Sequence, residues 1–270
     1  MTKVIVSSGL ERLNSADFRL LQEAAGLGGL HVLLWSDEAI RKLAGREPRY
    51  PQSEREYVIQ AIRYVHRVQV SGPDVDPDAL PGVLLFRPDI WVVEQSDDRP
   101  AKRAFCAAAG LRHHVLAPGD LAGFPEPPPA PPSGEKKVIV TGCYDFFHSG
   151  HVRFFEEAAG LGDLFVVVGN DENVRLLKGE GHPLLTAAER RFNVGSIRHV
   201  RQALISTGMG WMDAEPEIAR IEPDLYVVNE DGDKPEKREF CQKRGIEYVV
   251  LKRIPKEGLA RRSSTDLRGF

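Results

Sequence analysis

The chain repeats itself at a spacing of roughly 135 residues, and this repeat limits the folds that its 270 residues can adopt. Strand-forming runs, glycines and prolines recur at equivalent places in the two copies. The matching segments are 3–6 with 137–140, 23–28 with 157–162, 87–93 with 222–228, and 100–110 with 235–245. A chain built this way is expected to fold as two domains of the same architecture.

A proline-rich segment, residues 124–134, separates the two copies. Proline fixes φ and has no backbone N–H, so this run cannot continue a helix or a central strand. It predicts an extended, semi-rigid linker over residues 124–136. The expected domains are therefore residues 1–123 and residues 137–270.

Within the second copy, short apolar segments alternate with helical patterns. The predicted strands are 138–141, 164–168, 201–205, 225–228 and 247–251. One intervening helix is predicted to begin at the capping box formed by Thr186 and Glu189. Another is expected to be capped by Asp213, with Pro216 in its first turn. This alternation predicts an α/β fold in which each copy is a Rossmann-like, doubly wound parallel sheet.

Composition narrows the classes of protein. The net charge of −3 offers no basic surplus for nucleic acid. The three cysteines form no C-x-x-C pair, which indicates a reducing compartment. No apolar run reaches membrane-spanning length, and residues 1–8 are predicted to be a first strand and not a signal peptide. We expect a cytoplasmic protein without a nucleic-acid partner and without membrane insertion.

Two histidines, His148 and His151, stand where a predicted strand and a glycine-containing turn lead into an amphipathic helix. Such a junction directs backbone N–H groups at an anion. Residues three apart at a helix start share one face, so both imidazoles are aimed at the same anion. This predicts a phosphate site. A zinc site is disfavoured, because H-x-x-H needs further ligands that no nearby cysteine pair supplies.

Residues 142–151 resemble the HxGH nucleotidyltransferases, matching G-x-[FY]-D-x-x-H-x-G-H throughout. The resemblance is strongest to cytidylyltransferases that activate phosphoethanolamine, phosphocholine or glycerol 3-phosphate. It implies transfer of CMP from CTP to a small phosphorylated alcohol, with release of pyrophosphate. It also implies Mg²⁺ held mainly by the nucleotide phosphates, with no metal ligands from the chain.

The resemblance implies catalytic contacts from His148, His151, Lys178 and Arg190. Two of these assignments have alternatives. Lys178 also fits a solvated loop lysine. Arg190 also fits a helix anchor, because the first copy keeps an arginine, Arg55, at the same place.

The resemblance also implies a set of nucleotide-binding residues on the turn, after the fourth strand and near the C-terminus. They are Gly142, Cys143, Tyr144, Asp145, Gly150, Glu230, Asp231, Arg262, Ser263, Ser264 and Thr265. Asp145 is expected to cap or orient its loop and not to contact Mg²⁺. Residues 262–267 resemble the end of the family's R-T-x-G-[IV]-S-T-[ST] signature. Arg253 lies too far ahead of Ser263 to supply its arginine, so that role is expected to pass to Arg261 or Arg262.

Two other functions stay open. Residues 175–179 and 223–225 resemble the heptose-phosphate adenylyltransferases equally well, and this resemblance implies ATP and a sugar phosphate as the alternative to CTP. The second alternative is a nucleotide-binding regulator without turnover, and the intact His148 and His151 argue against it.

The first copy lacks the residues that carry the chemistry. It places Asn14, Ser15, Ala16 and Asp17 against the four residues 148–151, and Ala44 against Lys178. An aspartate in place of His151 would repel a triphosphate. We expect residues 1–123 to be a degenerate, non-catalytic copy. It would either serve as a built-in partner in an intramolecular pseudo-dimer, leaving further oligomerisation open, or bind a regulatory ligand.

Overall fold

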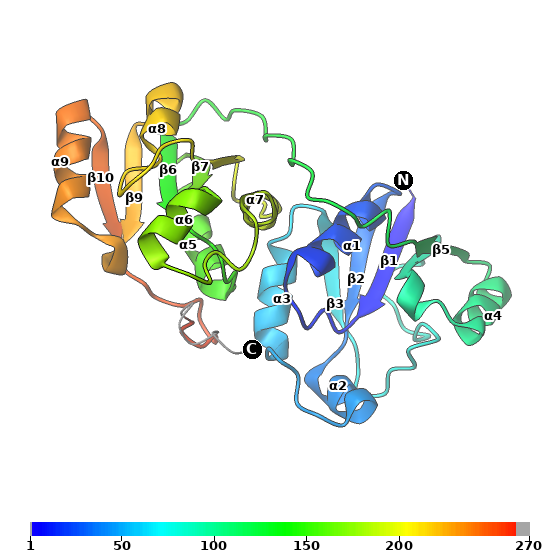
Figure 1. Cartoon of the computed structure of the whole chain (residues 1–270). Coiled ribbons are helices and arrows are strands. Elements are labelled where there is room, and N and C mark those ends of the chain that lie inside the picture. Colours follow the sequence, from blue (N-terminus) through cyan, green and yellow to red (C-terminus); the bar gives the residue numbers. More distant parts are fainter. Residues whose placement is uncertain (1, 263–270) are drawn as a thin grey trace. The chain divides into compact units, whose positions relative to one another are not determined.

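The computed structural model describes residues 2–262, which divide into two compact units between Gly123 and Phe124. Each unit contains one five-stranded sheet (Figure 1). The elements of the first unit are β1 (Lys3–Ser8), α1 (Ser15–Ala25), β2 (Gly29–Leu34), α2 (Asp37–Ala44), α3 (Gln52–Gln60), β3 (Val65–Val70), β4 (Ile90–Glu94), the 3-10 turn η1 (Gln95–Asp97), α4 (Pro100–Ala109) and β5 (Arg112–Leu116). Those of the second unit are β6 (Lys137–Gly142), α5 (Ser149–Ala159), β7 (Asp163–Val168), α6 (Asp171–Lys178), α7 (Ala187–Gly195), β8 (Gln202–Ile205), α8 (Glu215–Ile221), β9 (Leu225–Asn229), η2 (Glu230–Gly232), α9 (Pro235–Arg244) and β10 (Glu247–Leu251).

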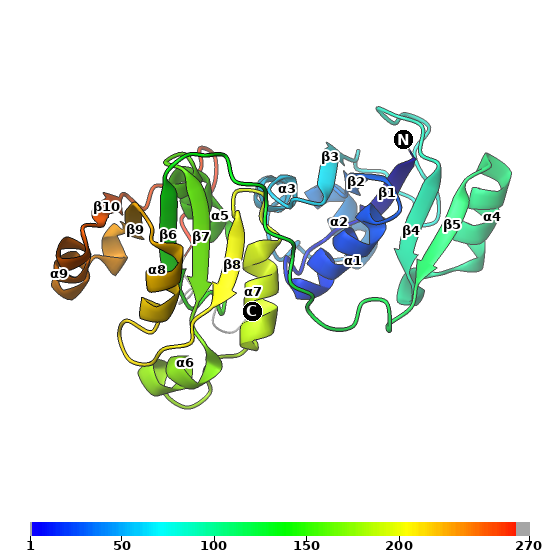
Figure 2. The same cartoon turned by 90° about the horizontal axis from the view of Figure 1, so that it is seen from above.

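The two sheets share one topology. The strand order is β3-β2-β1-β4-β5 in the first unit and β8-β7-β6-β9-β10 in the second, and all paired strands are parallel. Helices lie on both faces of each sheet (Figures 1 and 2). The predicted doubly wound α/β fold is thus confirmed. In each sheet the strand order reverses beside the first strand, and ligands of such sheets bind at that switch point.

The predicted strands of the second copy are all present, and Thr186 caps α7 as expected, accepting a hydrogen bond from Glu189 N at 3.2 Å. The prediction for Asp213 is wrong. Ala214 holds the N-cap position of α8 without a side-chain cap. The carboxylate of Asp213 instead accepts a hydrogen bond from Ser206 Oγ at 2.6 Å, and Ser206 is the residue that follows β8.

One apolar cluster of the second unit includes residues of the sheet and of the helices α8 and α9. Ile139 from the central strand β6 and Tyr226 from its neighbour β9 are fully buried there with Ile218 and Cys241. The first unit buries the equivalent Ile5, Trp91 and Cys106 in the same manner, which is why strands and helices of such different sequences keep one architecture.

The duplication extends to backbone details. Gly28 and Gly162 directly precede the second strand of each copy and have positive φ values of 154° and 151°. A Cβ at either position would overlap the preceding strand's entry, at Thr2 O or Lys136 O. Only glycine fits this close approach, so both copies retain it.

The proline-rich segment forms no helix or strand, and it belongs to the second unit, to which it is hydrogen-bonded. Ala130 exchanges two hydrogen bonds with Arg201, from Ala130 N to the Arg201 carbonyl at 2.9 Å and from Arg201 Nε to the Ala130 carbonyl at 3.1 Å. Glu126 pairs with Arg191 at 2.8 Å. Residues 124–130 thus lie against the β8 and α7 side of the second unit. No helix in the described part of the chain is both long and apolar enough to cross a membrane.

Candidate active site

A cavity of about 220 Å³ lies beyond the carboxyl ends of β6 and β9, at the switch point of the second sheet. Its walls come from the turn after β6, the first turn of α5, the end of α6, the η2–α9 region and Arg253. Side chains that line it and bear on its chemistry are Cys143, Tyr144, Asp145, His148, His151, Lys178, His182, Asn229, Asp231, Lys237 and Arg253.

His148 and His151 form a stacked pair in this cavity. Their ring centroids are 4.0 Å apart with an interplanar angle of 24°. His148 is the N-cap of α5, and its Nδ1 accepts a hydrogen bond from Gly150 N at 3.1 Å. In the neutral ring this leaves the proton on Nε2. The pair therefore combines one imidazole fixed by a helix cap with a second one held by stacking.

The environment of His151 keeps its ring neutral when no anion is present. Burial is the main cause that lowers the pKa of His151 well below 6.5, and the nearby His148, Arg253 and Lys178 add to the effect. Its buried Nδ1 has no hydrogen-bond partner among residues 2–262. A polyanion bound in this cavity would attract the protonated His151 ring and so raise the pKa of His151.

This pKa shift predicts a pH dependence of stability. Above about pH 6.5, His151 is neutral in both the folded and the unfolded chain. Below that value the unfolded chain binds a proton that the folded chain does not, so the free energy of unfolding falls as the pH falls. We expect this residue to account for about 1 kcal/mol of loss between pH 7.5 and 5.5. Urea unfolding of the wild type and of His151→Gln at both pH values measures it. An equal loss in both proteins would contradict it.

The turn after β6 places an aromatic side chain against the histidine pair. Tyr144 adopts a positive φ of 56° and is buried, with its ring 5.2 Å from that of His151 in an edge-on contact. Gly142 makes room for it, because a Cβ there would lie 2.8 Å from the Tyr144 ring. The strained turn thus serves to place an aromatic support under His151.

Asp145 orients a neighbouring loop. Its Oδ1 accepts hydrogen bonds from Leu184 N at 2.8 Å and Leu185 N at 3.0 Å, and its Oδ2 lies 3.1 Å from His182 Nδ1. Burial opposes ionisation of Asp145, but these hydrogen bonds outweigh it and lower its pKa. Both oxygens are occupied, in keeping with a loop-orienting role and not with an Mg²⁺ ligand.

Lys178 ends α6 and lies in the cavity wall, whereas its first-copy counterpart Ala44 has no charge. Asp231 also lies in the wall. Glu230 does not, and its Oε1 accepts a hydrogen bond from Arg253 N at 3.4 Å. Lys178 and Asp231 therefore line the same cavity as the histidine pair, and Glu230 does not.

Arg253 lies in the cavity wall, although it was not among the predicted site residues. Its guanidinium pairs with Asp231 and donates from Nη2 to the carbonyl oxygen of Arg262 at 2.9 Å. The chain from 253 to 262 thus returns to its own start. Ser263, Ser264 and Thr265 lie outside the described residues.

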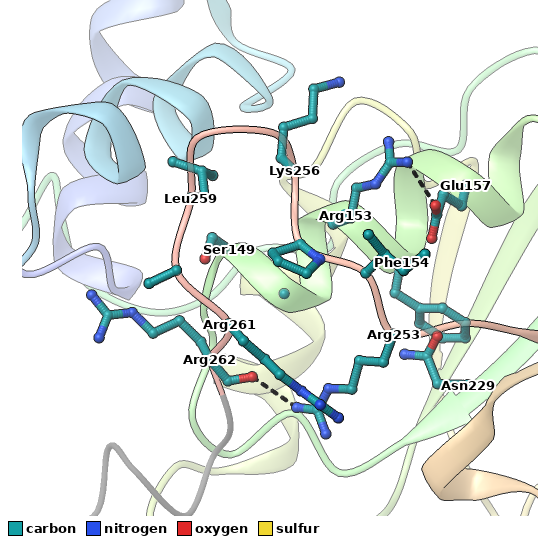
Figure 3. A pocket seen from close by; sticks show the side chains of 14 residues that line it. Ser149, Arg153, Phe154, Glu157, Asn229, Arg253, Lys256, Leu259, Arg261 and Arg262 are labelled. Atoms are coloured by element: carbon teal, nitrogen blue, oxygen red, sulfur yellow. Dashed lines mark hydrogen bonds and ion pairs between the residues drawn. The ribbon is translucent and has the colours of Figure 1, made fainter.

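Arg261 and Arg262 line a second pocket, together with Ser149 and Arg153 of α5 (Figure 3). Arg253 borders both pockets. In the second pocket Arg153 is paired with Glu157 at 2.6 Å, and Lys256 with Glu156 at 2.7 Å. The arginine that reaches the histidine cavity is thus Arg253, and Arg261 and Arg262 stand beside it.

Arg190 is an anchor beneath the site. It is fully buried and outside the cavity wall. Its guanidinium donates to the Leu185 carbonyl at 3.0 Å, to the Cys143 carbonyl at 2.7 Å and to Asp171 at 2.6 Å. These three contacts join the catalytic turn, the start of α6 and the loop before α7. These contacts support the anchoring alternative for Arg190 over the expected phosphate contact.

The first copy repeats this anchor with partners at the equivalent positions. Arg55 is also fully buried, and it donates to the Tyr50 carbonyl at 2.9 Å, the Gly9 carbonyl at 2.7 Å and Asp37 at 2.6 Å. A contact set that survives in a copy without the histidines belongs to the scaffold.

The equivalent mouth of the first copy holds an internal ion-pair network. Asp17 takes the position of His151, and it accepts hydrogen bonds from Arg12 Nε at 3.1 Å and Leu13 N at 2.7 Å. Arg12 also pairs with Glu94 at 3.3 Å, where the second copy has Asn229. The two carboxylates would repel a phosphate chain, and the charge of Arg12 is already balanced by its ion pairs with them.

Four polar or charged side chains of the cavity lining after β6 were not among the predicted site residues: His182, Asn229, Lys237 and Arg253. Two carried a usable signal. Asn229 is the last residue of β9, and strand ends form the mouth of such sheets. Lys237 is repeated in the first copy as Lys102. His182 and Arg253 lie in loops whose course no local pattern indicates.

Comparisons with known proteins agree with this geometry. The cytidylyltransferase-like family model matches residues 139–270. FAD synthase of Ferroglobus placidus is 37% identical over 125 residues, which are 45% of this chain and 78% of that protein. FAD synthase of Aciduliprofundum boonei is 37% identical over 136 residues, covering 49% and 84%. The bifunctional protein HldE of Hydrogenovibrio crunogenus is 38% identical over 101 residues, covering 36% of this chain and 20% of that protein.

The chain belongs to the cytidylyltransferase-like family of HxGH nucleotidyltransferases, which confirms the resemblance seen in residues 142–151. It is a nucleotidyltransferase. The expected preference for CTP is not confirmed, since relatives of this chain are named FAD synthase and HldE.

Gly150 offers a direct test of the histidine geometry. A Cβ at this position would lie 2.9 Å from the His148 ring, so Gly150→Ala is expected to displace that ring. We expect turnover to fall about 10- to 100-fold and the free energy of unfolding to fall by about 1–3 kcal/mol. The first copy combines Asn14 with Ala16, so adding Gly150→Ala to His148→Asn should cost no further stability. Urea unfolding of the two single variants and the double variant decides this, and additive losses would contradict it.

Proposed function

We propose that the second unit transfers an adenylyl group from ATP to a small phosphomonoester and releases pyrophosphate. The observation that carries this proposal is the stacked pair of His148 and His151 in a cavity whose wall also holds Lys178, Lys237 and Arg253. Such a concentration of donors around one hollow suits a polyphosphate.

In this reaction an oxygen of the acceptor phosphate attacks the α-phosphorus of the nucleotide. The bond from the α-phosphorus to the bridging oxygen breaks, and both electrons leave with pyrophosphate. The acceptor phosphate is largely dianionic at neutral pH, so no side chain needs to remove a proton from it. The imidazoles of His148 and His151 would donate to the phosphate oxygens on which charge accumulates.

We propose that Mg²⁺ enters with the nucleotide as part of the substrate. Residues 2–262 contain no group of three or more His, Cys, Asp or Glu side chains arranged to hold a metal ion. The chain would then contribute donors to the phosphates and leave the ion to the phosphate oxygens.

The choice of ATP is supported by the relatives' names. FAD is an adenine dinucleotide, so a chain similar to FAD synthases over 78% and 84% of their lengths is a reasonable adenylyltransferase. The second candidate is cytidylyl transfer from CTP to a phosphorylated alcohol, and it is supported by the description of the matching family.

A nucleotide and acceptor screen tests both candidates. Pyrophosphate release is measured with ATP or CTP and Mg²⁺, each with riboflavin 5′-phosphate, sugar phosphates, phosphoethanolamine, phosphocholine and glycerol 3-phosphate. We expect ATP with one acceptor to be turned over and CTP to be poorer. Turnover with CTP alone would favour the second candidate. Binding of a nucleotide without turnover of any acceptor would favour the non-catalytic regulator.

We propose that the first unit is non-catalytic and structural. Its ion-pair network of Arg12, Asp17 and Glu94 supports this.

A further inference from the structure

Lys237 is a cavity cation without a carboxylate partner. It lies on the first turn of α9, in the cavity wall. Its Nζ donates to the carbonyl oxygen of Gly232 at 3.2 Å and lies 5.9 Å from the centre of the Tyr226 ring. Within residues 2–262, no ion pair joins this ammonium to an acidic side chain.

The first copy contains the same lysine with an acid beside it. Lys102 is fully buried, its Nζ pairs with Asp97, and it lies 5.1 Å from the centre of the Trp91 ring. Trp91 and Tyr226 occupy equivalent positions, as do Lys102 and Lys237. Each lysine therefore lies near the aromatic ring at the same position of its own copy.

The neighbouring ion pairs confirm that the two segments are in register. Arg103 pairs with Asp98 in the first copy, and Arg238 pairs with Asp233 in the second, one position further along in each case. Asp97 is therefore equivalent to Gly232. The first copy supplies a carboxylate to its lysine, and the second copy has glycine at that place.

A half-buried ammonium without an ion-pair partner is unfavourable. Burial is the main cause that lowers the pKa of Lys237, the nearby Lys234 adds to it, and the charges of Asp233 and Asp213 offset only part of the shift. An anion bound in the cavity would supply the charge that Asp97 supplies to Lys102.

We propose that Lys237 binds a phosphate group in the cavity, and that Gly232 keeps open the place that the Asp97 carboxylate fills in the first copy. This inference rests on the proposed function. The phosphate belongs either to the nucleotide or to the acceptor, and the experiment below separates these sources.

The test compares two variants of the full chain that act in different ways. Lys237→Gln removes the charge and keeps the length of the side chain. Gly232→Asp keeps the charge and restores the internal pair. The position accepts a side chain, since the nearest heavy atom to its Cβ is Val228 Cβ at 3.9 Å. Lys234→Gln, an exposed lysine three residues away, is the matched control.

Calorimetric titration with ATP, CTP, inorganic pyrophosphate and inorganic phosphate gives the readout, with thermal unfolding to verify the fold. Both variants are expected to weaken phosphate binding about tenfold or more, and the control to stay within twofold. Loss for nucleotide and pyrophosphate places Lys237 on the triphosphate. Loss for inorganic phosphate alone places it on the acceptor.

The outcomes separate this inference from the proposed function. If the wild type binds ATP or CTP, and both folded variants bind all four probes within twofold of it, the inference is overturned and the function stands. If the wild type binds neither nucleotide, the proposed function fails and the inference fails with it.

Discussion

Replacing His151 with alanine is expected to lower turnover by about 10²- to 10³-fold, because the cavity loses one of two imidazole donors to the developing charge. Stability should change little at neutral pH, since the buried Nδ1 of His151 makes no hydrogen bond within residues 2–262. Steady-state pyrophosphate release, with the substrates found by the nucleotide and acceptor screen, measures the effect.

Two variants control for damage to the fold. Asn14 caps α1 as His148 caps α5, accepting from Ala16 N at 3.2 Å. His148→Asn should therefore keep the cap and still lose activity. Asn14→Ala should cost about 1 kcal/mol of stability and leave activity near that of the wild type. If Asn14→Ala proves as damaging to turnover as His151→Ala, the division of roles between the copies is wrong.

Replacing Arg190 with alanine is expected to lower the free energy of unfolding by about 3–5 kcal/mol. The change leaves two carbonyl oxygens and the Asp171 carboxylate without their shared donor, and it opens a hole under the catalytic turn. Arg190→Lys should recover only part of the loss, because an ammonium cannot reproduce the planar fork that reaches all three acceptors. Urea unfolding followed by circular dichroism measures both.

The matched variant is Arg55→Ala, which removes the same three kinds of contact from the first copy. It should cost a similar amount of stability in its own unit. The anchoring role would be contradicted by an Arg190→Ala protein that unfolds at the wild-type urea concentration and yet has lost turnover.

Much of the fold could be predicted from sequence because its signals are local or repeated. The alternation of apolar segments indicated the parallel sheets, and the repeat indicated two of them. The histidine site could be predicted because strand, turn and helix start are contiguous in residues 138–151. The prediction for Asp213 was wrong because an aspartate just before a helix has the same sequence pattern whether it caps the helix or accepts a hydrogen bond from Ser206.

The remainder depended on contacts between distant segments. The sequence around Arg190 is compatible with a phosphate contact and with an anchor that donates to three scaffold acceptors. The full burial of Arg190 in the structure favours the anchor. Arg253 reaches the cavity because the chain folds back to place the Arg262 carbonyl beside it. The proposed role of Gly232 depends on the ion pair between Asp97 and Lys102, which no local sequence pattern indicates.

A crystal structure with a non-hydrolysable triphosphate analogue is the most direct test of where the chemistry lies. The account predicts the triphosphate beside His148 and His151 in the second unit, with Arg253 within hydrogen-bond distance of a phosphate oxygen. A nucleotide bound at the mouth that contains Asp17, with none beside Tyr144, would contradict it.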